Sequence, residues 1–241
     1  MKIDFNSFIN RFSNRLHDIF NVESDINELS LKRGLPEAIW SEIMDLNPLS
    51  VAIPEKFGGR GTDVKECLSV LSAASYESLP LSLTFGINIA LFLEPLAKYG
   101  HHEIQEPTFK RFLDHQAMGG LMITEPDFGS DALNMETFFN EEQDSYHIKG
   151  KKHWQGLTGM ADYWLVVARE KMNSGKLSRD VSFFLTENNK SAQKINVDHY
   201  FNNPGLFMIP YGLNDIDINV HKNQKLVRRS VYRAQKSEIS A

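Results

Sequence analysis

The chain has 241 residues, of which 41% are hydrophobic and 24% are charged, and its formal net charge is −5. This composition is typical of a globular protein and excludes a disordered or low-complexity chain, while the negative charge argues against a general nucleic-acid binder. A lone cysteine, Cys67, excludes an internal disulfide and any metal site built from several cysteines.

The first segment of the chain predicts an amphipathic helix. Apolar residues recur at steps of three and four from Phe5 to Phe20, which places them on one helix face. Polar residues interrupt the segment, so it lacks the continuous apolar core of a secretion signal. No stretch approaches the roughly 20 apolar residues that a membrane span needs. We therefore expect a cytoplasmic protein without a membrane span.

Further helices are expected through the first half of the chain. Pro36 suits the start of a short helix, and Asp63 with Glu66 three residues on fits a capping box at the start of a longer one. Gly100 marks a helix end. The expected helices cover residues 37–46, 63–78, 81–99 and 108–113.

The hydrophobic period changes near residues 114–120, and short apolar runs separated by polar turns then predict strands. The runs over 135–139 and 146–149 flank a polar turn and predict a hairpin. The expected strands cover residues 119–124, 135–139, 146–149, 163–168, 181–185, 194–197 and 216–220. Short strands at this spacing predict a barrel or a sandwich. We therefore predict an α+β fold, with an all-α helical domain over 1–117 followed by a β-barrel domain over 118–226.

A basic tail over 227–241 ends the chain. The segment from Lys222 to Lys236 contains lysines and arginines but no acidic residue. Two interpretations stay open: a solvated helix or frayed terminus, and a site for an anion or a partner.

Several motifs that would indicate other activities are incomplete. Asp-Phe-Gly at 127–129 lacks the glycine-rich loop, the strand lysine and the His-Arg-Asp loop of a protein kinase. The glycine cluster at 58–61 lacks the lysine and hydroxyl residue of a P-loop. His101 and His102 would point about 100° apart on a helix, so they do not form a metal site together. No Gly-x-Ser-x-Gly motif of a serine hydrolase occurs, and we assign no metal ligand.

Four stretches carry a family resemblance. They are GGLMITEPDFGSD at 119–131, IKGKKHWQGLTGMADYWLVVAR at 148–169, IPEKFGGRG at 53–61 and IPYGLNDIDINVHKNQKL at 209–226. The first has Thr-Glu-Pro followed by Gly-Ser-Asp, and the second has Gly-x-Lys-x-Trp followed by an apolar strand that ends in Ala-Arg. In their order along the chain, these four stretches resemble the acyl-CoA dehydrogenase family over nearly the whole chain.

The resemblance implies a helical N-terminal domain packed on a β-barrel middle domain, followed by a third, helical domain. It implies FAD between the middle and third domains, with acyl-CoA along the seam. In this family a glutamate removes the α-proton and the β-hydride passes to the flavin. The third domain carries that glutamate, and this chain ends about where it would begin, so we assign no catalytic residue.

By position, the resemblance gives roles to five residues of the motifs at 119–131 and 148–169. Ile123 and Thr124 would present backbone and hydroxyl groups to the flavin ring. Gly129 and Ser130 would donate to the pyrophosphate, because glycine permits close approach and successive N–H groups bind anions. Trp154 would pack against the flavin.

Two places depart from the family pattern. Asp127 and Phe128 stand where small residues are usual, which puts a carboxylate beside the expected phosphates. Gly156 is also expected at the cofactor, but it stands where a flavin-bonding threonine is common. Gln155 or Thr158 are the candidates to replace that threonine.

Substrate contacts are expected from three residues. Ser130 lies in the motif that the family places nearest the cofactor and substrate. Phe85 and Ile89 lie at helical spacing on the expected helix over 81–99, where they could line an acyl pocket. Ordinary core packing is the alternative for these two apolar residues.

Two functions stay open. The first is an FAD-dependent dehydrogenase of acyl-CoA, or of a carrier-bound acyl thioester, whose third domain is cut off or is supplied by another polypeptide. Its expected partners are an electron-transfer flavoprotein or another acceptor, and further copies of the chain. The alternative is a non-catalytic partner subunit or acyl-binding module that keeps the fold and has lost flavin binding.

Overall fold

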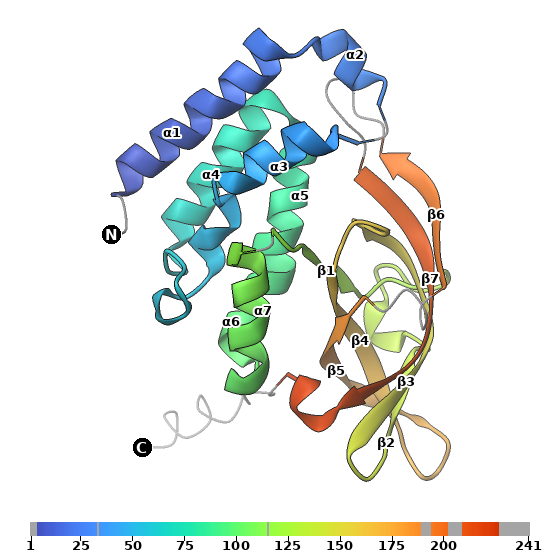
Figure 1. The fold of residues 1–241 in the computed structure, drawn as a ribbon. Helices are drawn as coiled ribbons and strands as arrows, with labels where there is room; N and C mark the ends of the chain where they lie inside the picture. Colours follow the sequence, from blue (N-terminus) through green and yellow to red (C-terminus); the bar gives the residue numbers. More distant parts are fainter. Residues whose placement is uncertain (1–3, 33, 115, 189–193, 202–208, 227–241) are drawn as a thin grey trace, which may run out of the picture.

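The computed structural model describes residues 4–32, 34–114, 116–188, 194–201 and 209–226, and for residues 194–201 and 209–211 it describes the backbone alone. Helices form the first half of the chain, and a curled sheet forms the second (Figure 1). This arrangement confirms the predicted α+β fold with the helices before the strands. The basic tail over 227–241 lies outside the described residues.

The helices occur where the sequence predicts them, except for α2, which was not predicted. They are α1 Phe5–His17, α2 Ile26–Ser30, α3 Glu37–Asp45, α4 Val64–Glu77, α5 Leu79–Gly86, α6 Glu94–Tyr99 and α7 His102–Asp114. Turns of π-helix continue α1 over Asp18–Glu23 and join α5 to α6 over Ile87–Leu93, and 3₁₀ turns lie at Pro48–Ala52, Glu55–Phe57, Ala132–Asn134 and Lys222–Gln224. The last predicted helix is longer than expected, because α7 already begins at His102.

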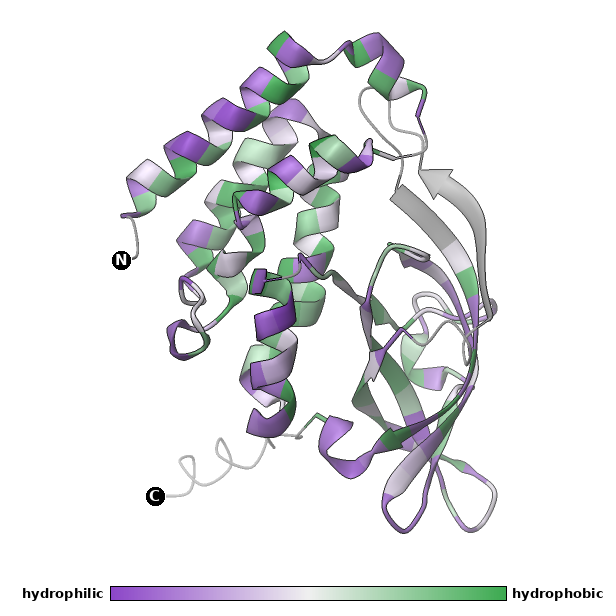
Figure 2. Ribbon diagram, in the orientation of Figure 1, coloured by the Kyte–Doolittle hydropathy of each residue, from purple (hydrophilic) through white to green (hydrophobic). Residues whose placement is uncertain are grey.

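The helix α1 illustrates why the sequence folds in this way. Its apolar residues Phe8, Phe12 and Leu16 are buried. Polar residues separate them along the chain, so the ribbon alternates between green and purple (Figure 2). Asp4 caps the helix by accepting a hydrogen bond from the Ser7 backbone N–H at 3.0 Å. The predicted apolar face is therefore the face that packs into the helical core.

The elements α5 and α6, with the π turn between them, form one helix over Leu79–Tyr99. Its 21 residues are long and apolar enough to cross a membrane by length and composition alone, so the expectation that no stretch reaches this limit is wrong. The side chains of Phe85, Phe92 and Leu96 are fully buried in the helical core. Packing inside the protein therefore accounts for these side chains, whereas Leu79, Leu83 and Leu91 of the same helix are 40–48% exposed.

The start of α4 confirms half of the predicted capping box. The Asp63 carboxylate accepts a hydrogen bond from the Glu66 backbone N–H at 3.1 Å. The Glu66 side chain pairs instead with Arg60, whose Nε lies 2.8 Å from it and whose guanidinium lies over the Phe8 ring. The nearby cation is a stronger partner for this carboxylate than a backbone N–H is.

Replacing Asp63 with alanine is expected to lower the free energy of unfolding by about 1 kcal/mol, because the first turn of α4 loses a capping acceptor. Urea unfolding measures this change. Asp63→Asn is the matched control, since asparagine caps helices about as well as aspartate. Equal losses in the two variants would show that the cap does not stabilise α4.

The strands are β1 Gly119–Met122, β2 Phe138–Glu141, β3 Ser145–Gly156, β4 Tyr163–Lys171, β5 Leu177–Glu187, β6 Lys194–Phe201 and β7 Ile209–His221. Hydrogen bonds give the order β1-β4-β2-β3-β7-β6, and β5 pairs with the other edge of β4. The predicted hairpin is confirmed, since β2 and β3 pair antiparallel with Phe138 opposite Lys149. Beyond this hairpin β3 continues to Gly156 along β7, so it is much longer than predicted.

The strand β4 organises the part of the sheet that carries the family-like motifs. Its residues from Tyr163 to Ala168 are buried. Both β1 and β2 run parallel to it along one edge, β1 beside residues 163–166 and β2 beside residues 169–170. Between β1 and β2 the chain leaves the sheet as a loop over residues 123–137.

The helical half and the sheet meet at Gly119. Its backbone N–H donates to the buried Asn88 side chain at 2.7 Å. A Cβ built on Gly119 would lie 2.4 Å from the Phe92 ring, and that ring is itself stacked on Phe112 and lies against Tyr163. Only glycine permits this approach of β1 to the Leu79–Tyr99 helix.

Two lysines of the predicted basic segment lie within the described residues. The Lys225 ammonium lies over the rings of Phe139 and Tyr146, at 4.6 and 4.8 Å from their centroids. Lys222 pairs with Glu141. Both lysines therefore contact the sheet, and the segment from 227 onward lies outside the described residues.

Candidate functional site

The family-like motifs at 119–131 and 148–169 meet at Thr124. The Thr124 carbonyl, just beyond the end of β1, accepts hydrogen bonds from the His153 backbone N–H and from Gln155 Nε2, both at 2.9 Å. Ile123 and Thr124 are half-buried at this point. The strand end and the tryptophan-bearing stretch of β3 therefore form one continuous surface.

Trp154 stands out from a β-bulge. The pairing of β3 with β7 shifts register between Lys152 and Gln155, and Trp154 adopts a left-handed backbone conformation with φ 63°. Its side chain is 50% exposed and stacks on His153, with ring centroids 4.5 Å apart. Because bulges turn a side chain away from the regular alternation of a strand, this one presents an aromatic face outside the sheet.

A buried ion pair lies behind this surface. The Glu125 carboxylate accepts hydrogen bonds from the backbone N–H groups of Glu136 at 2.6 Å and Thr137 at 2.9 Å. Lys152 Nζ donates to Glu125 Oε1 at 2.9 Å and to the Ile123 carbonyl at 3.1 Å. Glu125 is 4% exposed and Lys152 is fully buried. The pair thus joins both ends of the 123–137 loop to β3.

Both members of the pair have shifted pKa values. Burial by itself would raise the pKa of Glu125, but the Lys152 charge and the hydrogen bond from Thr137 outweigh it and hold this pKa below its usual value. Burial lowers the pKa of Lys152 to about 8, although Glu125 opposes the shift. At neutral pH the pair is therefore an ammonium facing a carboxylate.

Gly129 and Ser130 lie on the exposed side of the loop. A tight turn precedes them, in which the backbones of Glu125 and Phe128 bond to each other. A Cβ built on Gly129 would meet no atom of the described residues within 4 Å, so its backbone is open to a ligand. Asp127 is exposed as well, which lets its carboxylate turn toward water.

Gln155 and Thr158 do not replace the flavin-bonding threonine that is common in the family at the position of Gly156. Gln155 is buried, and its Nε2 donates to the Thr124 and His153 carbonyls. Thr158 is buried too, and its hydroxyl donates to the Gln155 carbonyl at 2.8 Å. Both side chains are thus occupied inside the protein, and at Gly156 only the half-buried backbone remains.

Phe85 and Ile89 lie in the helical core. Phe85 is fully buried, with its ring 6.2 Å from that of Phe12 and 6.3 Å from that of Trp40. Ile89 is 4% exposed. These surroundings are typical of ordinary core packing, which is the alternative interpretation of the two residues.

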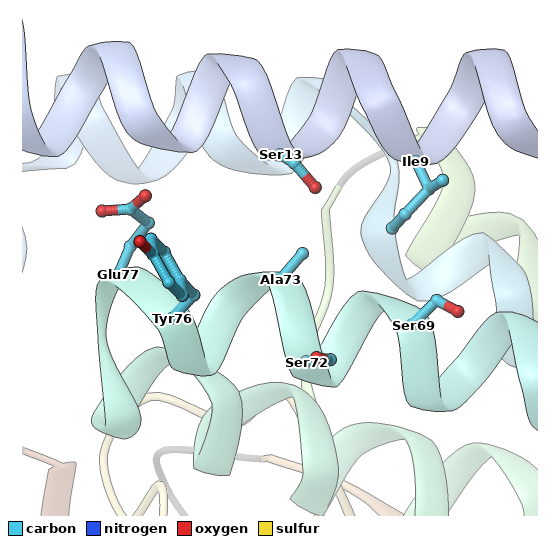
Figure 3. Close-up of a pocket in the computed structure, with 7 residues that line it drawn as sticks. All are labelled: Ile9, Ser13, Ser69, Ser72, Ala73, Tyr76 and Glu77. Carbon is cyan, nitrogen blue, oxygen red and sulfur yellow. The ribbon is translucent and has the colours of Figure 1, made fainter.

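Two hollows lie in the helical half. One, with a volume of about 360 Å³, separates α1 from α4 and is lined by Ile9, Ser13, Ser69, Ser72, Ala73, Tyr76 and Glu77 (Figure 3). The other is lined by Asn47, Lys56, Phe57, Gly58, Glu106, Lys110, Leu113 and Asp114. Neither includes a predicted cofactor residue. Over the described ranges, no three His, Cys, Asp or Glu side chains are placed to hold a metal ion.

The ion pair of Glu125 with Lys152 and the position of Asn214 were not predicted from the sequence. Asn214, on β7, is fully buried, donates to Gln155 Oε1 and Thr158 Oγ1 at 3.3 Å, and leaves its own Oδ1 without a partner in the described structure. Charged residues within the family-like motifs were the available signal for the ion pair. No signal in the sequence placed Asn214 beneath the bulge.

Family models match most of the chain. The model described as "Acyl-CoA dehydrogenase, N-terminal domain" matches residues 20–116, and the model described as "Acyl-CoA dehydrogenase, middle domain" matches residues 120–213. The two matches lie on the helical half and on the sheet respectively.

Curated relatives are similar at modest identity. Mitochondrial isovaleryl-CoA dehydrogenase of Pongo abelii is 25% identical over 148 residues, which cover 61% of this chain and 35% of that protein. Benzylmalonyl-CoA dehydrogenase of Aromatoleum aromaticum is 28% identical over 178 residues, which cover 74% of this chain and 45% of that protein. The matched part of the chain therefore spans less than half the length of these relatives.

Solved structures share the fold. Butyryl-CoA dehydrogenase from Megasphaera elsdenii superposes with a TM-score of 0.75 at 19% identity, over 95% of this chain and 61% of that one. The glutaryl-CoA complex of glutaryl-CoA dehydrogenase gives 0.76 at 21% identity, over 95% and 58%. The FAD complex of PigA gives 0.80 at 16% identity, over 99% and 62%.

Proposed function

The chain belongs to the acyl-CoA dehydrogenase family, and on this basis we propose that it takes part in the FAD-dependent α,β-dehydrogenation of an acyl thioester. The observation that carries the proposal is the contact of the Thr124 strand end with the Trp154 bulge. This contact joins the two stretches whose family counterparts would hold a flavin.

The groups around this contact suit a flat aromatic ring with a phosphate tail. The half-buried Ile123 and Thr124 would bind the ring edge, and the exposed Trp154 would cover the ring and exclude water from it. The open backbone at Gly129 and Ser130 would bind the pyrophosphate. When bound there, FAD would supply the hydride acceptor.

Other parts of the reaction lie outside these residues. We propose that the catalytic base and the rest of the cofactor site come from a further domain, on this polypeptide or on a partner. An electron-transfer flavoprotein or another acceptor would take the electrons, and a second copy of the chain is a candidate partner. We propose Ser130 beside the acyl thioester, and we leave Phe85 and Ile89 as core residues.

Titration of the purified chain with FAD tests the proposal. Wild type is expected to give a yellow complex whose flavin is released on denaturation. Trp154→Ala should weaken binding about tenfold, because the ring loses the aromatic face that stacks on it. Tyr76→Ala, which removes an 86% exposed aromatic ring from α4, is the matched control and should leave binding unchanged. A chain that retains no flavin after free FAD is removed, even when the third domain of a relative is added, would contradict the proposal.

One observation favours the alternative of a non-catalytic partner subunit or acyl-binding module. Gly156 has no side chain to bond a flavin, and Gln155 and Thr158 donate inside the protein. A cofactor site without this hydrogen bond holds its ligand less tightly. Binding of an acyl-CoA by a chain that binds no FAD would decide for this alternative.

A further inference from the structure

The loop over residues 123–137 is closed by side chains as well as by backbone bonds, which join the Thr137 carbonyl to the Arg169 N–H and the Thr124 carbonyl to the His153 N–H. Its two ends lie beside different parts of β4. The Glu125 carboxylate holds the far end by its bonds to the backbone N–H groups of Glu136 and Thr137, and Lys152 holds the near end at the Ile123 carbonyl. The pair therefore bonds backbone groups from both ends of the loop.

The same pair lies next to the bulge that carries Trp154. Lys152 is the last paired residue of β3 before the register shift. On the other side of the shift, His153 and Gln155 bond the Thr124 carbonyl. The left-handed backbone of Trp154 is unusual for a residue with a side chain and persists only where its surroundings fix it.

Stability alone gives little reason to bury these two charges. Removing an ammonium and a carboxylate from water is costly, and replacing a buried ion pair with well-packed apolar side chains is often neutral or stabilising. Apolar side chains would fill the space between β1 and β3, but they would bond none of the backbone groups at Ile123, Glu136 and Thr137. The ion pair adds directional hydrogen bonds to these backbone groups.

We infer that Glu125 and Lys152 form a positioning pair, which holds the Thr124 end of the loop against the Trp154 bulge and so prearranges the surface for a flavin dinucleotide. The inference rests on the proposed function. Neither residue touches the ligand. Both act through the backbone of residues 123–137 and through the bulge.

The test removes the charges without leaving one of them unpaired. The variant Glu125→Gln/Lys152→Met keeps the side-chain volumes and abolishes the pair. The matched control is Asp217→Asn/Lys149→Met, which removes an exposed ion pair, with Nζ and Oδ2 3.5 Å apart, from β3 and β7 of the same sheet. Urea midpoint, amide hydrogen exchange at Glu136, Thr137 and His153, and affinity for FAD are measured on the full chain.

The buried double variant is expected to keep its unfolding midpoint, to exchange the three amides about tenfold faster, and to bind FAD about tenfold more weakly. The surface double variant should match wild type in all three. A folded buried variant with wild-type exchange and wild-type affinity overturns the inference. A purely structural pair would change the midpoint together with the affinity, and that result overturns it too.

A second variant tests the inference if the double variant does not fold. Glu125→Asp keeps the charge facing Lys152 but draws the carboxylate back by one methylene, away from the Glu136 and Thr137 N–H groups. Faster exchange at these two amides supports the inference, and unchanged exchange overturns it. If wild type binds no FAD, the proposed function fails, while the exchange experiment still decides whether the pair closes the loop.

Discussion

Replacing Lys152 alone with methionine is expected to lower the free energy of unfolding by about 3–5 kcal/mol. The change leaves Glu125, which is 4% exposed, without the ammonium that lies 2.9 Å from its carboxylate. Methionine fills the space of the lysine stem but donates no hydrogen bond to the Ile123 carbonyl. Urea unfolding near neutral pH measures the loss. Lys149→Met, on an exposed site of the same strand, should change stability by no more than about 0.5 kcal/mol.

The loss caused by Lys152→Met should depend on pH. In wild type the pKa of Glu125 lies below its usual 4.5, so its contribution to stability is present above that pH and is lost as the pH falls through the folded value. Without the cation, burial loses its main opposing effect, so we expect the folded pKa of Glu125 to rise. The variant then regains stability relative to wild type as the pH falls toward 4.5. A loss of equal size at neutral and acid pH would contradict this account.

Much of the fold could be predicted because its signals are local. The helix α1 follows from apolar residues at steps of three and four, and their burial needs no knowledge of the partner. The strand β4 follows from an unbroken apolar run, as expected for a strand buried on both faces. The Leu79–Tyr99 helix also follows from a local apolar run, of which half is buried inside the protein.

The candidate site could be predicted only in part. The family resemblance pairs Thr124 with Trp154, and the structure shows that the Thr124 carbonyl bonds His153 and Gln155, the two neighbours of Trp154. The directions of Gln155 and Thr158 were not predictable, because a one-residue bulge changes the face on which the following side chains lie. The bond between Glu125 and Lys152 joins residues 27 positions apart, and spacing along the chain gives no sign of it.

Replacing Phe92 with alanine is expected to lower the free energy of unfolding by about 3–5 kcal/mol. The ring is fully buried, stacks on Phe112 and touches Tyr163, so it joins the Leu79–Tyr99 helix to α7 and to the sheet. These neighbours are held by their own elements and cannot close the cavity that remains. Thermal or urea unfolding measures the effect.

The contact between Phe92 and Gly119 makes this prediction sharper. In the wild-type protein Gly119→Ala should cost about 1–3 kcal/mol, because the new methyl group would lie 2.4 Å from the ring. In the Phe92→Ala variant the same substitution should cost close to nothing, since the methyl group enters the cavity. Gly129→Ala, where a Cβ meets no described atom within 4 Å, is the control for the loss of a glycine. Additive costs at positions 92 and 119 would show that the helix and β1 are not in direct contact there.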